Sequence, residues 1–319
     1  MNTHADSKKS DARAESTHTR AWSKPTDWPV ALALGLLRLI SAIPFPYNVR
    51  IGKCFGNLLY IIPSRRKHIV LTNLKLCFPE LSDKERGKLC KEVIQNYGAG
   101  MVETAMAWWA DKERLYKLVD IEGLELLETA QQKGKGVLLL GAHFTTLDLG
   151  AAFAGKYFDY SLVYKPQRGE YFDRSMYEGR RRHAEQNIKK TELRKLIKTI
   201  RGGNIVWYAP DQDDGLKNSV FAPFFGQTAA TLTATANLAR LTDAPVLMYG
   251  QHRKSDDSGY VMRITGPLDN FPSGDEVADA TAVNALIEEA VRHTPAQYYW
   301  FHRRFKTQPQ RSRGELYDV

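Results

Sequence analysis

The chain reads VLLLGAHFTTLD over residues 137–148, and this stretch decides its fold class. Four aliphatic residues followed by a glycine are typical of a buried strand that ends in a small-residue turn. The residues from 145 to 157 then carry the pattern of a helix. A histidine between the two elements is expected at the carboxyl edge of a sheet, where open α/β folds bind their ligands.

His143 and Asp148 are five positions apart and form a candidate catalytic pair. Asp148 falls about one turn into the predicted helix, so its carboxylate can turn back toward the ring. Such a carboxylate fixes the tautomer of the imidazole and stabilises the imidazolium that forms when a hydroxyl proton is taken. The alternative is a histidine and a first-turn acid that only favour the helix terminus.

The sequence contains none of the common motifs of covalent or phosphate-dependent chemistry: GxSxG, GxxxxGK[ST], GxGxxG and HExxH are all missing. Its three cysteines, Cys54, Cys77 and Cys90, match neither a zinc site nor a disulfide framework. We interpret them as reduced core thiols, which suits the cytoplasm. We therefore expect no metal and no cofactor, and a direct transfer in which a base deprotonates a hydroxyl that attacks an activated donor.

The formal net charge of +9 over 319 residues indicates acidic partners. Nucleic acid, anionic lipid and an acidic carrier protein all qualify. The basic residues are scattered in short runs, at 65–67, 180–182, 189–190 and 303–304. A nucleic-acid reader is expected to carry a clustered stripe instead, so this scatter argues against nucleic acid.

From about residue 117, short apolar runs alternate with amphipathic segments. The predicted strands are 118–121, 137–140, 160–164, 205–209, 245–249 and 260–264. The predicted helices are 124–132, 145–157, 172–186, 191–201, 230–241 and 281–293. This alternation predicts an α/β fold with a mostly parallel central sheet flanked by helices, over residues 117–307.

The N-terminal part is organised differently. Residues 1–27 are polar and predict a disordered leader. Residues 28–62 contain two apolar pieces, 30–43 and 55–62, of which the longer has about 14 residues, short of the ~20 that span a bilayer. We therefore expect an interfacial or half-inserted membrane anchor, with a spanning helix and a helix packed on the protein's own core as alternatives. Residues 63–116 are expected to be helical and 308–319 to form a polar tail.

A capping box at Ser82 and Glu85 predicts the start of a long helix that ends near Trp108 and Trp109. Further along, WYAPDQD at 207–213 repeats the pattern of a strand followed by an acid, which places Asp211 in the same crevice as His143.

Two aromatic segments follow. FAPFFG at 221–226 contains Phe224 and Phe225 and predicts either an apolar wall for an acyl chain or a plug in the core. QYYWFHRRFK at 297–306 holds five aromatic residues in ten positions, which a solvated tail would not.

Together, these motifs resemble the bacterial lipid A biosynthesis acyltransferases, within the wider HxxxxD glycerolipid acyltransferase fold group. The segment NLKLCFPELSDKER at 73–86 resembles the N-terminal part of the same family, so the likeness covers about residues 30–309. Many members carry Glu where Asp148 stands. The resemblance implies an acyl donor on acyl carrier protein, a hydroxyl acceptor on a lipid A precursor, membrane lipids as surroundings, and a place at the cytoplasmic face of the inner membrane.

The resemblance also implies roles for individual residues. His143 would remove the proton of the acceptor hydroxyl, and Asp148 would orient His143. Arg180 matches a recurrent family arginine that would stabilise the oxyanion or hold a phosphate. The alternative is that Arg180 is only one of three adjacent arginines exposed to solvent. The remaining candidates for substrate binding are Asp211, which would position Arg180 or the acceptor, together with Asp213, Phe224, Phe225, and Arg303 and Arg304, which would meet lipid phosphates or the carrier protein.

Three other functions stay open at this point. An acyltransferase on another glycolipid or on a lysophospholipid would keep the same catalytic residues. A membrane-surface binding protein without catalysis is a second possibility, and nucleic-acid binding is the weakest.

Overall fold

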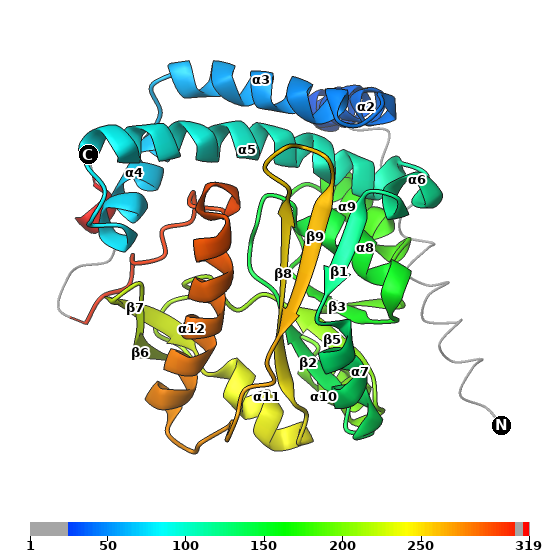
Figure 1. Cartoon of the computed structure of the whole chain (residues 1–319), viewed down its shortest axis with the longest axis vertical. Helices are drawn as coiled ribbons and strands as arrows, with labels where there is room; N and C mark the ends of the chain where they lie inside the picture. The colour runs from blue at the N-terminus through cyan, green and yellow to red at the C-terminus, as the bar shows by residue number, and fades with distance from the viewer. Residues whose placement is uncertain (1–24, 310–314, 319) are drawn as a thin grey trace.

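The computed structural model describes residues 25–309 and 315–318 (Figure 1). A seven-stranded sheet forms its centre, in the order β1-β9-β8-β2-β5-β3-β4. Its strands are β1 (Val119–Glu122), β2 (Val137–Leu140), β3 (Ser161–Tyr164), β4 (Gln186–Lys189), β5 (Ile205–Tyr208), β8 (Val246–Arg253) and β9 (Tyr260–Thr265). Among the described strands of this sheet, only the neighbours β8 and β9 are antiparallel. The prediction of a mostly parallel sheet is confirmed.

Helices cover both faces of the sheet. The helices of the α/β part are α6 (Lys112–Tyr116), α7 (Leu124–Gln132), α8 (Leu147–Tyr157), α9 (Glu170–Arg181), α10 (Leu193–Arg201), α11 (Ala234–Thr242) and α12 (Glu276–His293). Side chains of α7, α8 and α9 pack in one hydrophobic cluster, and those of α10, α11 and α12 pack in a second. The strands supply both clusters because successive side chains point to opposite faces: Tyr249 lies in the first cluster and Met248 in the second.

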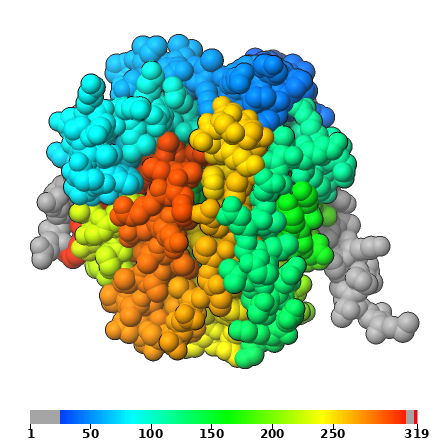
Figure 2. All heavy atoms as spheres, in the orientation of Figure 1, coloured from blue at the N-terminus to red at the C-terminus, as the bar shows by residue number. Residues whose placement is uncertain are grey.

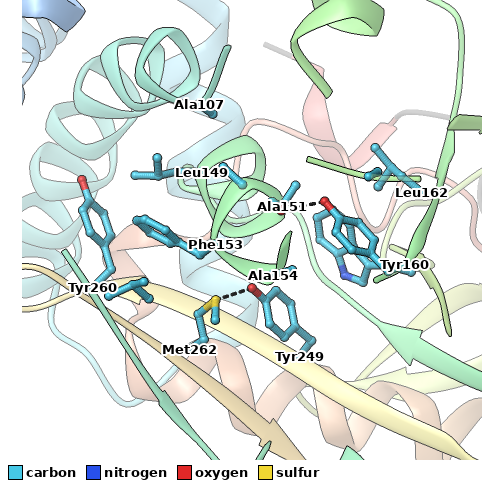
Figure 3. Close-up of a cluster of buried hydrophobic side chains, with 14 of the residues drawn as sticks. Ala107, Leu149, Ala151, Phe153, Ala154, Tyr160, Leu162, Tyr249, Tyr260 and Met262 are labelled. Carbon is cyan, nitrogen blue, oxygen red and sulfur yellow. Dashed lines mark hydrogen bonds between the residues drawn. The ribbon is translucent and has the colours of Figure 1, made fainter. Parts of the chain in front are cut away.

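The first cluster is rich in tyrosine, and Tyr160, Tyr249 and Tyr260 lie close together in it (Figure 3). The hydroxyl groups of these three residues are hydrogen-bonded. Tyr160 donates to the carbonyl of Ala151 at 2.6 Å, and Tyr249 donates to the carbonyl of Gly150 at 2.7 Å. Both acceptors belong to α8. Because a buried hydroxyl without a partner is costly, these bonds fix α8 on the sheet, and with it the loop that carries His143.

The long helix α5 (Asp83–Trp109) lies across one end of the sheet (Figure 1). It begins at the predicted capping box, in which Ser82 and Glu85 satisfy each other's backbone N–H groups. Gly100 of α5 is so close to the loop after β2 that a Cβ atom there would lie 2.7 Å from the carbonyl oxygen of Thr145. Helix α5 thus covers the carboxyl edge of the sheet.

Two helices, α2 (Trp28–Ala42) and α3 (Tyr47–Ile61), pack on the outer side of α5 and form one end of the molecule (Figure 2). Outward side chains at helical spacing leave an exposed apolar face, made of Leu32, Leu36 and Leu39 of α2 and Ile51, Phe55 and Leu58 of α3. Leu32 is 77% and Leu39 is 71% exposed. Among residues 25–309 and 315–318, no helix combines the length and apolar character needed to cross a bilayer.

The remaining elements differ from the prediction. Strand β4 was not predicted, and α9 ends at Arg181, five residues before the end of the helix predicted at 172–186. The aromatic segment at 221–226 belongs to a hairpin of β6 (Ser219–Phe224) and β7 (Gln227–Leu232), which also replaces the predicted start of the helix at 230. α4 (Arg65–Cys77) and the short helices η2 (Pro25–Asp27), η3 (Pro295–Gln297) and η4 (Glu315–Tyr317) complete the described chain.

The ends of the chain are only partly described. The predicted disordered leader lies outside the described residues except for 25–27, and so does part of the predicted polar tail. Tyr317 of that tail is fully buried. Cys77 and Cys90 are buried free thiols as expected, whereas Cys54 is exposed on α3.

Candidate active site

His143 and Asp211 meet because their strands are neighbours in register. Leu140 and Tyr208, the last residues of β2 and β5, are paired, and Gly141 continues the ladder by donating to the carbonyl of Tyr208 at 2.8 Å. Each chain then runs three residues further, to His143 and to Asp211. His143 Nδ1 lies 2.6 Å from Asp211 Oδ1, and the backbone N–H of His143 donates to Asp211 Oδ2 at 3.0 Å.

Asp211 is buried and also accepts a hydrogen bond of 2.9 Å from the hydroxyl of Tyr298. Burial alone would raise the pKa of Asp211, but the nearby His143 and the hydrogen bonds from His143 and Tyr298 hold it well below its usual range. A carboxylate that stays ionised can only accept, so Nδ1 of His143 carries a hydrogen and Nε2 of the neutral ring is free to take a proton.

The same contact acts on the imidazole. Burial alone would lower the pKa of His143, but the charge and hydrogen bond of Asp211 raise it above its ordinary value. The His143 side chain is still 31% exposed, so solvent or a substrate can reach it. This is the arrangement of a general base whose imidazolium form is stabilised by a buried carboxylate.

The C-terminal segment holds the loop of His143 in place. Thr145 donates its N–H to the carbonyl of Gln297, Tyr299 donates to the carbonyl of His143, both at 2.8 Å, and Phe144 and Tyr298 form an antiparallel bridge between them. The segment thus acts as a short extra strand against residues 143–145. Sequence reasoning noticed the aromatic content of this segment but did not find Tyr298 as a partner of Asp211.

The structure does not show the expected contact between Asp148 and His143. Asp148 instead pairs with Arg180, whose Nε and Nη2 donate to its two oxygens at 2.7 and 3.2 Å, and it accepts from Trp108 Nε1 at 3.1 Å. The first turn of α8 points this carboxylate toward α5 and α9. Gly179 makes the approach possible, because a Cβ atom there would lie 2.3 Å from the ring of Trp108.

The Asp148–Arg180 pair is nearly buried, with the two side chains 11% and 14% exposed. Burial alone would raise the pKa of Asp148, but Arg180 and the hydrogen bond from Trp108 lower it. The pair lies close enough to influence His143 electrostatically: Arg180 lowers the pKa of His143 and Asp148 raises it. Two carboxylates therefore act on the imidazole of His143: Asp211 by direct contact and Asp148 at a distance.

The three adjacent arginines are not alike. Arg182 donates to the carbonyls of Trp108 and Ala110 at the end of α5, the latter at 2.9 Å, and caps that helix. Arg181 is exposed. With Arg180 paired to Asp148, the interpretation of three solvated arginines does not hold.

Several predicted substrate-binding residues are structural. Asp213 is buried and accepts from the N–H and the hydroxyl of Thr307 at 2.9 and 3.0 Å. Arg304 is also buried, donates to the carbonyl of Ala230 at 2.6 Å and lies over the ring of Phe224. A buried guanidinium cannot meet a lipid phosphate or a carrier protein, so that expectation is corrected for Arg304.

Phe224 and Phe225 pack in the second hydrophobic cluster, and Phe225 contacts the rings of Phe78 and Trp300. This packing favours the plug in the core over the apolar wall.

In the C-terminal segment, Arg303 is half-buried. His302, which no sequence pattern singled out, accepts the N–H of Asp213 at 2.8 Å, and burial lowers its pKa to about 4, so it is held neutral.

Fold and site together define the class: an α/β protein with a carboxylate-backed histidine at the carboxyl edge of a mostly parallel sheet. The sequence family described as "Bacterial lipid A biosynthesis acyltransferase" matches residues 15–307. Lipid A biosynthesis lauroyltransferase of Escherichia coli (strain K12) is 37% identical over 287 residues, covering 90% of this chain and 94% of that protein. The chain belongs to the bacterial lipid A biosynthesis acyltransferase family.

Other relatives carry other acyl names. Lipid A biosynthesis palmitoleoyltransferase of the same E. coli strain is 37% identical over 292 residues, covering 91% of this chain and 95% of that protein. Lipid A biosynthesis myristoyltransferase of that strain is 26% identical over 317 residues, covering 98% and 96%. Because two relatives named for different acyl groups are equally similar, overall identity does not select the acyl chain.

Proposed function

We propose that the protein is an O-acyltransferase that moves a fatty acyl chain from acyl carrier protein to a hydroxyl group of a lipid A precursor. The observation that carries the proposal is the bond between His143 Nδ1 and the buried carboxylate of Asp211 at 2.6 Å, which leaves Nε2 as a base at the partly open edge of the sheet. Family membership supplies the lipid A pathway.

The proposed reaction is a direct transfer. Nε2 of His143 takes the proton of the acceptor hydroxyl while the hydroxyl oxygen attacks the carbonyl carbon of the thioester. The new C–O bond forms, the C–S bond breaks, and the thiolate of the carrier leaves with the proton from the imidazolium. Asp211 stabilises the imidazolium between these steps.

Arg180 is the candidate for stabilising the negative charge that develops on the thioester oxygen. Its ion pair with Asp148 fixes the guanidinium close to His143. We infer that Asp148 serves the reaction as a positioning residue for Arg180, in place of the role first expected for it.

The place of the reaction is the cytoplasmic face of the inner membrane. The exposed apolar face of α2 and α3 supports this, because side chains such as Leu32 and Leu39 would be buried in the lipid interface. Exposed cations lie beside it, Arg38 and Arg50 on the same helices and Arg65 and Arg66 after α3, and anionic lipid attracts such residues. Membrane lipids are thus proposed partners alongside the carrier protein and the acceptor.

The test is acyl transfer by purified protein in detergent, with acyl carrier protein loaded with an acyl chain and a lipid A precursor as the acceptor. His143→Ala is expected to lose about 100- to 10,000-fold of the activity. His293→Ala, an exposed histidine on α12, is the matched control and should retain it. Transfer by the His143→Ala protein at the wild-type rate would refute the mechanism.

Two alternative functions give different outcomes. Transfer to a lysophospholipid or to another glycolipid, but not to the lipid A precursor, would change the acceptor and keep His143. A protein that binds vesicles but turns over no thioester in any assay would be a membrane-surface binding protein.

A further inference from the structure

A large part of the net charge of the chain is concentrated in one surface segment. Residues 186–201 contain six lysines and arginines against a single acid, Glu192, so they contribute five of the nine net positive charges. All six cations are exposed. We call this surface the basic stripe; its members are Lys189, Lys190, Arg194, Lys195, Lys198 and Arg201.

Most of the basic stripe is carried by α10, a helix with two distinct faces. Leu196 and Ile200 are buried against the sheet, and the cations point outward. Arg194 and Lys198 are one turn apart, as are Lys195 and Lys198, and such like-charge pairs destabilise a helix. In the described part of the chain, Arg194, Lys195 and Lys198 take part in no ion pair. Their charge is therefore available to a partner.

The basic stripe begins at the edge of the candidate active site. Lys189 is the last residue of β4 and Lys190 follows it. Because β4 runs parallel to the strands before His143 and Asp211, all four residues lie at the same edge of the sheet. Lys190 Nζ also contacts Asp214 Oδ2 at 3.2 Å, in the loop that carries Asp211. From there the stripe follows α10 away from that edge.

The far end of the stripe lies away from the apolar face. α2 and α3 form one end of the long axis of the molecule, whereas α10 lies with α7 and α11 toward the other (Figure 1). A membrane that contacts α2 and α3 would therefore be distant from α10. The charge of the stripe is suited to a soluble acidic partner that approaches beside the membrane.

We propose that the basic stripe is the docking surface for acyl carrier protein, which reaches the active site across the carboxyl ends of β4 and β3. The proposal rests on the proposed function, because it concerns the partner that brings the donor. Acyl carrier proteins are strongly acidic, so attraction between exposed charges would raise the rate of encounter and be screened over about 8 Å at physiological ionic strength.

The experiment compares two triple charge reversals in the full-length protein. Arg194→Glu, Lys195→Glu and Lys198→Glu alter the stripe. Lys84→Glu, Lys91→Glu and Lys133→Glu change the same charge at exposed positions elsewhere and serve as the control. Michaelis constant and turnover number are measured with acyl carrier protein and with a small acyl-pantetheine thioester, along with vesicle binding and the unfolding midpoint.

The stripe variant is expected to raise the Michaelis constant for the carrier-bound donor by about tenfold or more, with an unchanged turnover number. In the stripe variant, this Michaelis constant should also depend less on salt concentration than in the wild-type protein. The small thioester, vesicle binding and the control variant should show no change. An unchanged constant for the carrier-bound donor in the stripe variant would overturn the proposal, and so would a loss of vesicle binding in its place.

The outcome also separates this proposal from the function on which it rests. If the wild-type protein uses the small thioester but not the carrier-bound donor, the proposed donor is wrong, and the docking surface falls with it. If the wild-type protein uses the carrier-bound donor and the reversals have no effect, only the docking surface is wrong.

Discussion

At the scale of single residues, the protonation of His143 depends on Asp211. Because Asp211 raises the pKa of His143 and the proposed reaction needs the neutral ring, activity should rise with pH through that pKa. Asp211→Asn should move this rise to lower pH and reduce kcat/KM at the plateau by about 100- to 10,000-fold, through the loss of the stabilised imidazolium. A pH-rate profile measures both effects. A profile that keeps its wild-type position would contradict the assigned contact.

A change at Tyr298 should shift the pH-rate profile in the opposite direction. Its hydroxyl donates to Asp211 at 2.9 Å and so shares the negative charge that supports His143. Tyr298→Phe leaves that charge to His143 alone, so the pKa of His143 should increase and the activity rise should move to higher pH, with a small loss at the plateau. A purely structural role of Tyr298 would change stability without displacing the profile.

Asp148 and Arg180 form a buried pair whose disruption should be costly. Asp148→Asn leaves Arg180 buried without its counter-charge, which typically costs about 3–5 kcal/mol of unfolding free energy. The pKa of Asp148 is depressed, so its contribution is present above the ordinary pKa of an aspartate and is lost as the pH falls through the folded value.

Urea unfolding between pH 3 and pH 7 tests this assignment, since the difference between wild type and Asp148→Asn should shrink toward the acid end. The double variant Asp148→Asn with Arg180→Leu is the control, because it removes both charges and should recover part of the loss. Equal losses in the single and double variants would argue against the pair.

At the scale of elements, the attachment of α3 to α5 depends on glycine. A Cβ atom on Gly98 would lie 2.3 Å from the carbonyl oxygen of Gly52. Gly98→Ala should therefore separate the helices and lower the unfolding midpoint. Gly87→Ala, on the same helix with open space around it, should instead raise stability by roughly 0.5–1 kcal/mol. Similar midpoints for the two variants would mean that the crossing tolerates a methyl group.

The elements that the sequence predicts best are those with strong local signals. The capping box at Ser82 and the apolar run of β2 predicted their elements correctly. β4 reads QNIK and has neither an apolar run nor a clear alternation, so it was missed. The hairpin of β6 and β7 was missed too, because Pro223 is unfavourable within a strand and the alanine-rich second strand favoured the helix that was predicted from residue 230. In both cases tertiary packing outweighs local preference.

At the scale of the whole molecule, the apolar face of α2 and α3 predicts attachment to membranes. Leu36→Glu with Leu39→Glu places two charges on this face, where both side chains are exposed, and should reduce sedimentation with anionic vesicles while leaving the unfolding midpoint unchanged. Leu241→Glu with Val277→Glu, at exposed positions outside this face, is the control and should bind as wild type does. Equal binding by both variants would place the attachment elsewhere.

The site shows what a sequence can and cannot give. His143 and Asp211 were both placed at the carboxyl edge because each follows a buried strand. Their pairing was missed because the spacing of His143 and Asp148 suggested a local partner, while the true partner is 68 residues away. Arg304 looked like a surface cation because nothing in the sequence shows that β7 and α12 surround it.

The equal length of the two loops after β2 and β5 has a consequence for how this site can vary. The hydrogen-bond ladder sets the starting point of each loop, and three residues lead from it to His143 on one side and to Asp211 on the other. An insertion or deletion in either loop shifts one side chain along the sheet edge and separates the pair. Relatives that keep this chemistry are therefore expected to conserve loop length here, while gaps in their alignment collect in connections that bear no part of the dyad.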